Sequence, residues 1–137
     1  MIFSNWEKRP HLLRKCNGTS EFVPMTKALI VEDNRAFRLA LAEVLHSHYP
    51  SLKIDLETDG DGLFSKIEAF HPDIIFMDIR LPGENGLGLA KKIKKNYPGI
   101  TIVILTSYDL PEYRDAARRS GADYFIAKDS ALSSESF

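Results

Sequence analysis

Five short apolar runs, separated by segments of roughly helical length, are the feature that most limits how this chain can fold. The runs are residues 28–31, 52–56, 74–77, 102–105 and 124–127. Four of them are almost continuously apolar, which is typical of parallel strands covered by helices on both faces of a sheet. The run 52–56 alternates between apolar and polar residues, so we expect it at a sheet edge with one wetter face.

The segments between these runs carry apolar residues at helical spacing. In the first, Phe37, Ala40, Leu41, Val44 and Leu45 follow an i, i+3, i+4 pattern, and shorter stripes lie within 63–70, 87–97 and 113–120. Asn34 is a plausible N-cap and Pro50 a stop for the first helix. Pro111 suits the first turn of the fourth helix, and Gly121 suits its C-terminal cap. Right-handed crossovers between successive strands would then place helices on both faces.

The predicted fold is therefore α/β, a doubly wound parallel (βα)5 sheet. Only residues 129–137 follow Lys128, which is about two helical turns, so the fifth helix is expected to be short or truncated.

Composition describes an ordinary globular domain. The chain has 137 residues, of which 44% are apolar and 27% charged, and its net charge of −1 does not favour bulk attraction to nucleic acid or to a membrane surface. A single cysteine, Cys16, cannot form an internal disulfide, which favours a reducing compartment. With no long apolar stretch either, we expect a cytoplasmic location.

The first 24 residues differ from the rest, because they show no sustained period and mix Trp6 with prolines and a glycine. We interpret residues 1–24 as an N-terminal extension, disordered or non-native, and residues 25–137 as the domain. The alternative is a short docking segment built on Trp6, Leu12 and Leu13.

Polar residues follow four of the apolar runs at the point where each run ends. They are Glu32 and Asp33, Asp78, Thr106, and Lys128. Binding sites in open α/β sheets form at the carboxyl ends of the strands, so we expect these side chains to converge. Each has an ordinary explanation in isolation, such as a solvated turn acid, a cap, a strand residue or a surface lysine, but those explanations are less credible together.

The convergence points to a hard metal ion and a phosphoryl group. Clustered carboxylates repel one another, and Mg²⁺, which takes oxygen ligands, would remove that repulsion. A carboxylate such as Asp78 can accept a phosphoryl group as a nucleophile. Thr106 can donate a hydrogen bond to a phosphoryl oxygen, and Lys128 can neutralise its charge.

The stretches 28–34, 72–86, 104–107 and 120–128 carry these residues in an order and spacing that resembles the receiver (CheY-like) domains of two-component response regulators. The resemblance covers residues 27 to about 130. It implies a flavodoxin-like sheet with strand order 2-1-3-4-5. The Lys-Asp-Ser sequence at 128–130, where most receivers have proline after the lysine, is similar to receivers of LuxR/NarL-type regulators, and we expect a trans peptide bond there.

The resemblance also implies roles for individual residues. Asp78 would receive a phosphoryl group from the phosphohistidine of a sensor histidine kinase or a phosphotransfer protein. Mg²⁺, or Mn²⁺ in its place, would be held by Asp33, Asp78 and the backbone carbonyl of Arg80, with Glu32 acting partly through water. Thr106 and Lys128 would bind the phosphoryl oxygens.

The same resemblance implies a switch. Thr106 would move toward the phosphoryl group and Phe125 would turn inward, changing the face formed by the fourth helix, fifth strand and fifth helix, through which a homodimer could form. Such a domain catalyses its own phosphorylation and dephosphorylation but is mainly a signalling switch. Large residues at Arg80 and Tyr108 would crowd attacking water and lengthen the phosphorylated lifetime, whereas Ser107 is small and leaves room for a bulky donor.

Three other interpretations compete with this one. A pseudo-receiver would act as a phosphorylation-independent interaction module. A haloacid-dehalogenase-like phosphatase would need a second acid two residues after its nucleophile, where this chain has Arg80. A flavin-binding module would need a phosphate-binding loop where Glu32 and Asp33 would repel phosphate. For the chain alone we expect no membrane or DNA binding, although a DNA-binding output domain could belong to a longer protein.

Overall fold

The computed structural model describes residues 13–15, 22–24, 26–81, 83–107 and 110–132. Its centre is a five-stranded parallel sheet of order β4-β3-β5-β8-β9. The strands are β3 (Lys27–Val31), β4 (Lys53–Glu57), β5 (Ile74–Asp78), β8 (Thr101–Thr106) and β9 (Tyr124–Ala127). Numbered within the sheet alone, this order is 2-1-3-4-5, so the predicted flavodoxin-like topology is confirmed.

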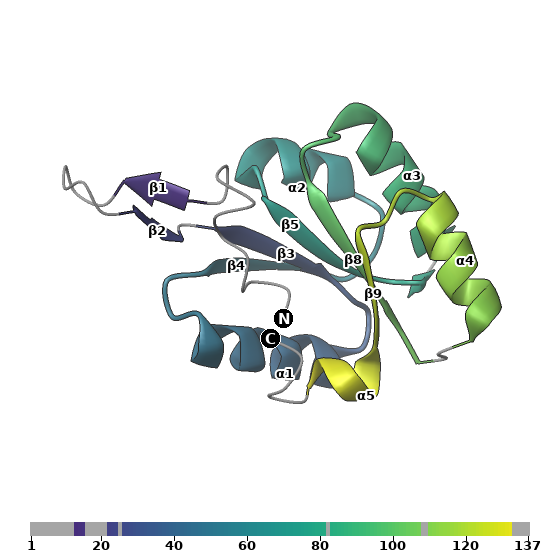
Figure 1. The fold of residues 1–137 in the computed structure, drawn as a ribbon, viewed down its shortest axis with the longest axis horizontal. Coiled ribbons are helices and arrows are strands. Elements are labelled where there is room, and N and C mark those ends of the chain that lie inside the picture. The colour runs from purple at the N-terminus through teal and green to yellow at the C-terminus, as the bar shows by residue number, and fades with distance from the viewer. Residues whose placement is uncertain (1–12, 16–21, 25, 82, 108–109, 133–137) are drawn as a thin grey trace.

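Helices cover both faces of the sheet, as expected (Figure 1). The helices are α1 (Arg35–His48), α2 (Leu63–Phe70), α3 (Gly86–Asn96), α4 (Pro111–Arg119) and α5 (Lys128–Ala131). In Figure 1, α1 and α5 lie below the sheet, whereas α2, α3 and α4 lie on the opposite side. Two separate clusters of buried apolar residues correspond to these two layers.

The strands match their predicted positions closely. β5 and β8 are buried along their whole length, as the continuous apolar runs at 74–77 and 102–105 indicated. β4 lies at the sheet edge and is shifted by one residue from the run 52–56, because Leu52 instead joins the core next to α1. Its residues are exposed or half-buried, which agrees with the predicted edge position.

The predicted helix ends are also confirmed. The Asn34 side chain accepts a hydrogen bond from the Phe37 N–H, which makes it the N-cap of α1. Pro111 lies in the first turn of α4. Gly121, with φ of 90°, follows the α4 C-cap Ser120, and the N–H groups of Gly121 and Ala122 bond back to Arg118 and Ala117, which is the Schellman arrangement that glycine favours.

α5 is the short helix that the sequence predicted, four residues long within the described part of the chain. None of the described peptide bonds is cis, so the expectation of a trans bond after Lys128 is confirmed. Within the N-terminal segment, β1 (Leu13–Lys15) and β2 (Phe22–Pro24) pair antiparallel and form their own two-stranded sheet. Trp6 and Leu12, two of the three residues of the docking-segment hypothesis, lie outside the described residues.

A short hairpin connects β5 to α3 and shapes the region beyond Asp78. It consists of β6 (Arg80–Leu81) and β7 (Glu84–Asn85), which pair antiparallel. α3 begins directly after it at the buried Gly86, whose N–H donates to the carbonyl of Ile79. A methyl group at Gly86 would collide with the carbonyl of Asp78, so only glycine lets α3 start this close to the strand end.

Candidate functional site

The register of the sheet brings the predicted site residues to one edge. Asp78 pairs with Leu105 and Thr106 pairs with Ala127, so the ends of β5, β8 and β9 are level. Glu32 follows β3, whose last residue Val31 pairs with Met77. A cleft of about 390 Å³ opens at this edge. Its wall includes Glu32, Asp33, Asn34, Asp78, Ile79, Arg80, Thr106, Ser107, Tyr113 and Lys128.

Three carboxylates gather at the base of this cleft. Glu32, Asp33 and Asp78 each place a carboxylate oxygen within 4.8 Å of the other two. Glu32 is fully buried and Asp78 is only 6% exposed, whereas Asp33 faces solvent. Hard oxygen donors at this spacing, with one side open to water, suit a divalent cation such as Mg²⁺, which keeps several waters when it binds protein.

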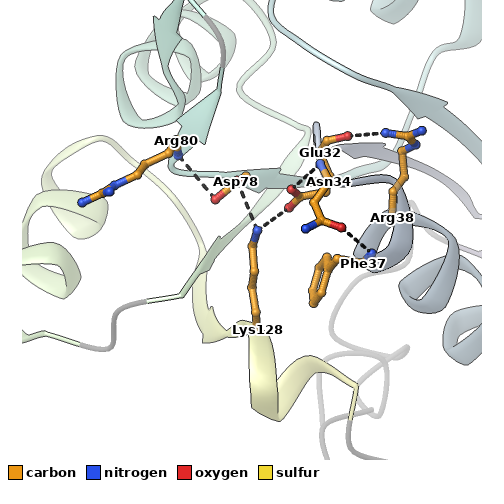
Figure 2. Close-up of polar contacts among 7 residues, drawn as sticks. All are labelled: Glu32, Asn34, Phe37, Arg38, Asp78, Arg80 and Lys128. Carbon is orange, nitrogen blue, oxygen red and sulfur yellow. Dashed lines mark hydrogen bonds and ion pairs between the residues drawn. The ribbon is translucent and has the colours of Figure 1, made fainter.

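Lys128 bridges two of these acids (Figure 2). Its ammonium lies 2.8 Å from Glu32 Oε2 and donates a hydrogen bond of 3.2 Å to Asp78 Oδ2. The other oxygen of Asp78 accepts a longer hydrogen bond, 3.4 Å, from the backbone N–H of Arg80. The phosphoacceptor candidate is therefore oriented from both sides.

The burial of this group of charges shifts two pKa values. Burial raises the pKa of the Glu32 carboxyl, and the Asp78 charge adds to that rise, against the opposing effects of Lys128 and the Asn34 N–H. Burial acts to lower the pKa of Lys128, but its contact with Glu32 and the charges of Asp78 and Glu32 outweigh this effect. The pKa of Lys128 is consequently raised, and the side chain stays a cation at neutral pH.

The first turn of α1 fixes Glu32 and reaches Lys128. The Asn34 N–H donates to Glu32 Oε1 at 3.0 Å, and the Arg38 guanidinium donates to the Glu32 carbonyl at 2.7 Å. The ring of Phe37 lies under the Lys128 ammonium, 4.9 Å from ring centroid to Nζ. The sequence predicts a capping role for Asn34 and a core position for Phe37, and it assigns no role to Arg38. The one signal for Phe37 and Arg38 is that they lie three and four residues after the Asn34 cap, which puts them in the first turn of the helix beside the strand end.

The remaining predicted residues are placed as follows. Thr106 is 3% exposed in the cleft wall, and the exposed Ser107 lies beside it. Phe125 is half-buried against the α2–α3–α4 layer, away from the cleft lining, and the Arg114 guanidinium lies over its ring at 5.1 Å. Tyr108 lies outside the described residues. Tyr113, which the helical pattern assigned to the core stripe of α4, also lines the cleft.

Comparison with known proteins agrees with this geometry. The family model for the response regulator receiver domain matches residues 28–134. This chain belongs to that family. It is a receiver domain of two-component response regulators, and the members of this family bind a divalent metal ion and interact with histidine kinases.

Particular relatives refine the comparison. The oxygen regulatory protein NreC of Staphylococcus carnosus is 33% identical over 103 residues, which is 74% of this chain and 48% of NreC. The chain thus spans about half the length of the curated relatives it matches. A LuxR-family DNA-binding response regulator from Staphylococcus aureus superposes with a TM-score of 0.72 at 27% identity, covering 80% of this chain and 91% of that one.

A third similarity is to an activated receiver. The BeF3-activated N-terminal receiver domain of Klebsiella pneumoniae RstA superposes with a TM-score of 0.69 at 30% identity, covering 74% of this chain and 85% of that one. The predicted likeness to LuxR/NarL-type receivers is confirmed by the matches to NreC and to the LuxR-family regulator. Among the helices that the structure describes, none has the length and apolar character needed to cross a membrane.

Proposed function

We propose that Asp78 is the phosphoacceptor of this receiver, taking its phosphoryl group from the phosphohistidine of a sensor histidine kinase or a phosphotransfer protein. The observation that supports this most directly is the position of the Asp78 carboxylate. It lies in the cleft wall at the end of β5, is held by one ammonium and one backbone N–H, and is within 4.8 Å of two further acids.

In the proposed transfer, an oxygen of Asp78 forms a bond to phosphorus while the phosphorus–nitrogen bond of the donor histidine breaks. The imidazole keeps the electron pair of that bond. Such transfers depend on positioning and charge neutralisation more than on covalent chemistry by other side chains. Lys128 is placed to neutralise the new negative charge, because its ammonium already contacts Asp78 Oδ2. Thr106, in the same wall, supplies a hydroxyl for a phosphoryl oxygen.

We assign the metal site to Asp33, Asp78 and the backbone carbonyl of Arg80, with Glu32 acting partly through water. Mg²⁺ is the proposed ion, and Mn²⁺ would replace it. When bound, the ion supplies positive charge that offsets both the acids and the phosphoryl oxygens. The exposed Asp33 is the carboxylate of this set that an incoming hydrated ion meets first.

Phosphorylation is proposed to switch the face formed by α4, β9 and α5. The added group carries about −1.5 to −2 charges if it behaves like other protein phosphates, and Thr106 would move toward it. Phe125 would then turn inward from its present position under Arg114. A homodimer through this face is the proposed consequence for the whole protein.

We propose that this domain belongs to a longer protein with a DNA-binding output domain, because it is similar to a DNA-binding response regulator of the LuxR family and spans about half the length of NreC. Residues 25–137 would form the receiver and residues 1–24 an extension outside it, which agrees with a family match beginning at residue 28. We expect the receiver to act in the cytoplasm, because the chain's one cysteine is compatible with a reducing compartment.

Intact-mass measurement after incubation with Mg²⁺ and acetyl phosphate or phosphoramidate tests this proposal. One added phosphoryl group is expected on the wild-type chain, and none on Asp78→Asn or in EDTA. Asp73→Asn is a matched control, because Asp73 precedes the opposite end of β5, where its carboxylate accepts a hydrogen bond from the Lys27 N–H. Phosphorylation that survives in Asp78→Asn would refute the assignment, and no adduct with any donor would favour the pseudo-receiver.

A further inference from the structure

Two carboxylates and one aromatic ring enclose the Lys128 ammonium on three sides. Glu32 Oε2 and Asp78 Oδ2 lie within 3.2 Å of its nitrogen, and the Phe37 ring presents its face at 4.9 Å (Figure 2). The Lys128 side chain is only 15% exposed. A cation over an aromatic face is attracted by the ring quadrupole, and the attraction strengthens when water is excluded.

The two carboxylates do not by themselves define where this ammonium lies. A lysine side chain has four rotatable carbon–carbon bonds and loses considerable rotamer freedom when it is fixed. Lys128 is also the first residue of a four-residue helix that has no side-chain cap. When Asp78 becomes phosphorylated its contact with Lys128 must change, whereas the ring of Phe37 and the buried Glu32 can remain in place.

Phe37 is held firmly relative to the acids. Its backbone N–H donates to the side-chain oxygen of Asn34, and the backbone N–H of Asn34 donates to Glu32 Oε1. The next residue, Arg38, is bonded to the Glu32 carbonyl. The ring therefore belongs to a capped turn that is tied to Glu32, directly after β3, by two hydrogen bonds, and it also packs against the apolar layer under α1.

We propose that Phe37 is a positioning residue for phosphoryl transfer, whose ring face holds the Lys128 ammonium between Glu32 and Asp78. This inference rests on the proposed function of Asp78, because Lys128 acts on the phosphoryl group formed there. Phe37 itself touches neither Asp78 nor the phosphoryl group in this assignment. Its effect passes through the cation that it orients.

The test replaces the ring in two ways. Phe37→Leu removes the aromatic face, and 3,4,5-trifluorophenylalanine incorporated at position 37 keeps the shape of the ring but weakens its quadrupole. Phe70→Leu is the matched control. Phe70 is another partly buried ring beneath a lysine, with Lys27 Nζ 5.7 Å from its centroid, but it ends α2, away from the cleft lining.

Two measurements are made on each variant of the full chain. The first is the NMR shift of the Lys128 ε-methylene group, assigned by its loss in Lys128→Met, which reports whether the side chain lies over an aromatic face. The second is the rate of phosphorylation by phosphoramidate with Mg²⁺. The loss of one partly desolvated ring–cation contact corresponds to a fall of about three- to ten-fold in that rate.

The proposal predicts that Phe37→Leu moves the Lys128 signal downfield and that both Phe37 variants slow phosphorylation. In a Lys128→Met background, neither Phe37 variant should slow phosphorylation further. Phe70→Leu should leave the signal and the rate unchanged. The proposal would be overturned if the trifluorinated ring left the phosphorylation rate unaltered, or if it slowed phosphorylation by the same factor in the Lys128→Met background. Both results can be obtained even if Phe37→Leu fails to fold. A wild-type chain that takes no phosphoryl group would instead refute the function of Asp78, while the NMR shift would still decide whether the ring holds the ammonium.

Discussion

The two glycines at the start of α3 offer a sharp test of how the site is built. A methyl group added at Gly86 would collide with the carbonyl of Asp78 and approach the Ile79 Cα at 3.1 Å. At Gly88, two residues later on the same helix, the same methyl would meet no atom within 4 Å. Alanine substitutions at these positions are chemically identical but should have opposite effects.

The magnitudes follow from two opposing terms. Alanine is more favourable than glycine in a helix by about 0.5–1 kcal/mol, so Gly88→Ala should raise the free energy of unfolding by that amount. Overpacking costs about 1–3 kcal/mol. The upper end of that range applies at Gly86, because the added methyl group would meet backbone atoms rather than a flexible side chain. Gly86→Ala should therefore lower the free energy of unfolding by roughly 2 kcal/mol.

Urea unfolding followed by circular dichroism measures both changes. At roughly 4 °C per kcal/mol for a domain of this size, the two variants should also differ by about 10–12 °C in Tm. Because the collision is with Asp78 itself, Gly86→Ala should phosphorylate more slowly than Gly88→Ala. Equal stabilities for the two variants would show that α3 does not pack against the end of β5 in the way described.

Three further predictions concern the ion and the switch. Millimolar Mg²⁺ should raise the Tm of the wild-type chain, by the equivalent of about 1.4 kcal/mol at ten times its Kd, and a melt that does not respond would argue against the acid cluster as a metal site. Arg114→Ala should release the Phe125 ring and speed phosphorylation by phosphoramidate about two- to five-fold, whereas Arg118→Ala, which removes only a surface ion pair with Asp115, should leave the rate unchanged. Arg80→Ala should shorten the lifetime of the phosphorylated form by opening the cleft to water, and an equal or longer lifetime would show that this side chain does not shield the phosphoryl group.

The sheet could be predicted because the same residues favour a strand locally and fit a position covered by helices on both faces. The runs at 74–77 and 102–105 are short, continuously apolar and rich in β-branched residues, which favours strands covered on both faces, and that is where β5 and β8 lie. Asn34 and Gly121 were predictable as well, since capping depends on a few neighbouring residues.

The acids and Lys128 could be placed at one edge from sequence, but their pairing could not. Full burial of Glu32 beside Lys128 depends on side-chain directions across two non-adjacent strands, β3 and β9. The contact of Phe37 with Lys128 joins residues 91 positions apart, and the helical pattern gives the same apolar signal whether a ring faces the core or a cation. The role of Gly86 likewise appears only when the start of α3 is set against the carbonyl of Asp78.

The position of the phosphoryl group tests the central claim most directly. The chain would be phosphorylated with phosphoramidate and Mg²⁺, then treated with borohydride, which reduces an aspartyl phosphate to homoserine, and mapped by peptide mass spectrometry. The account predicts homoserine at position 78 and at no other aspartate. Homoserine at Asp33, or a phosphoryl group on a residue outside the cleft, would contradict it.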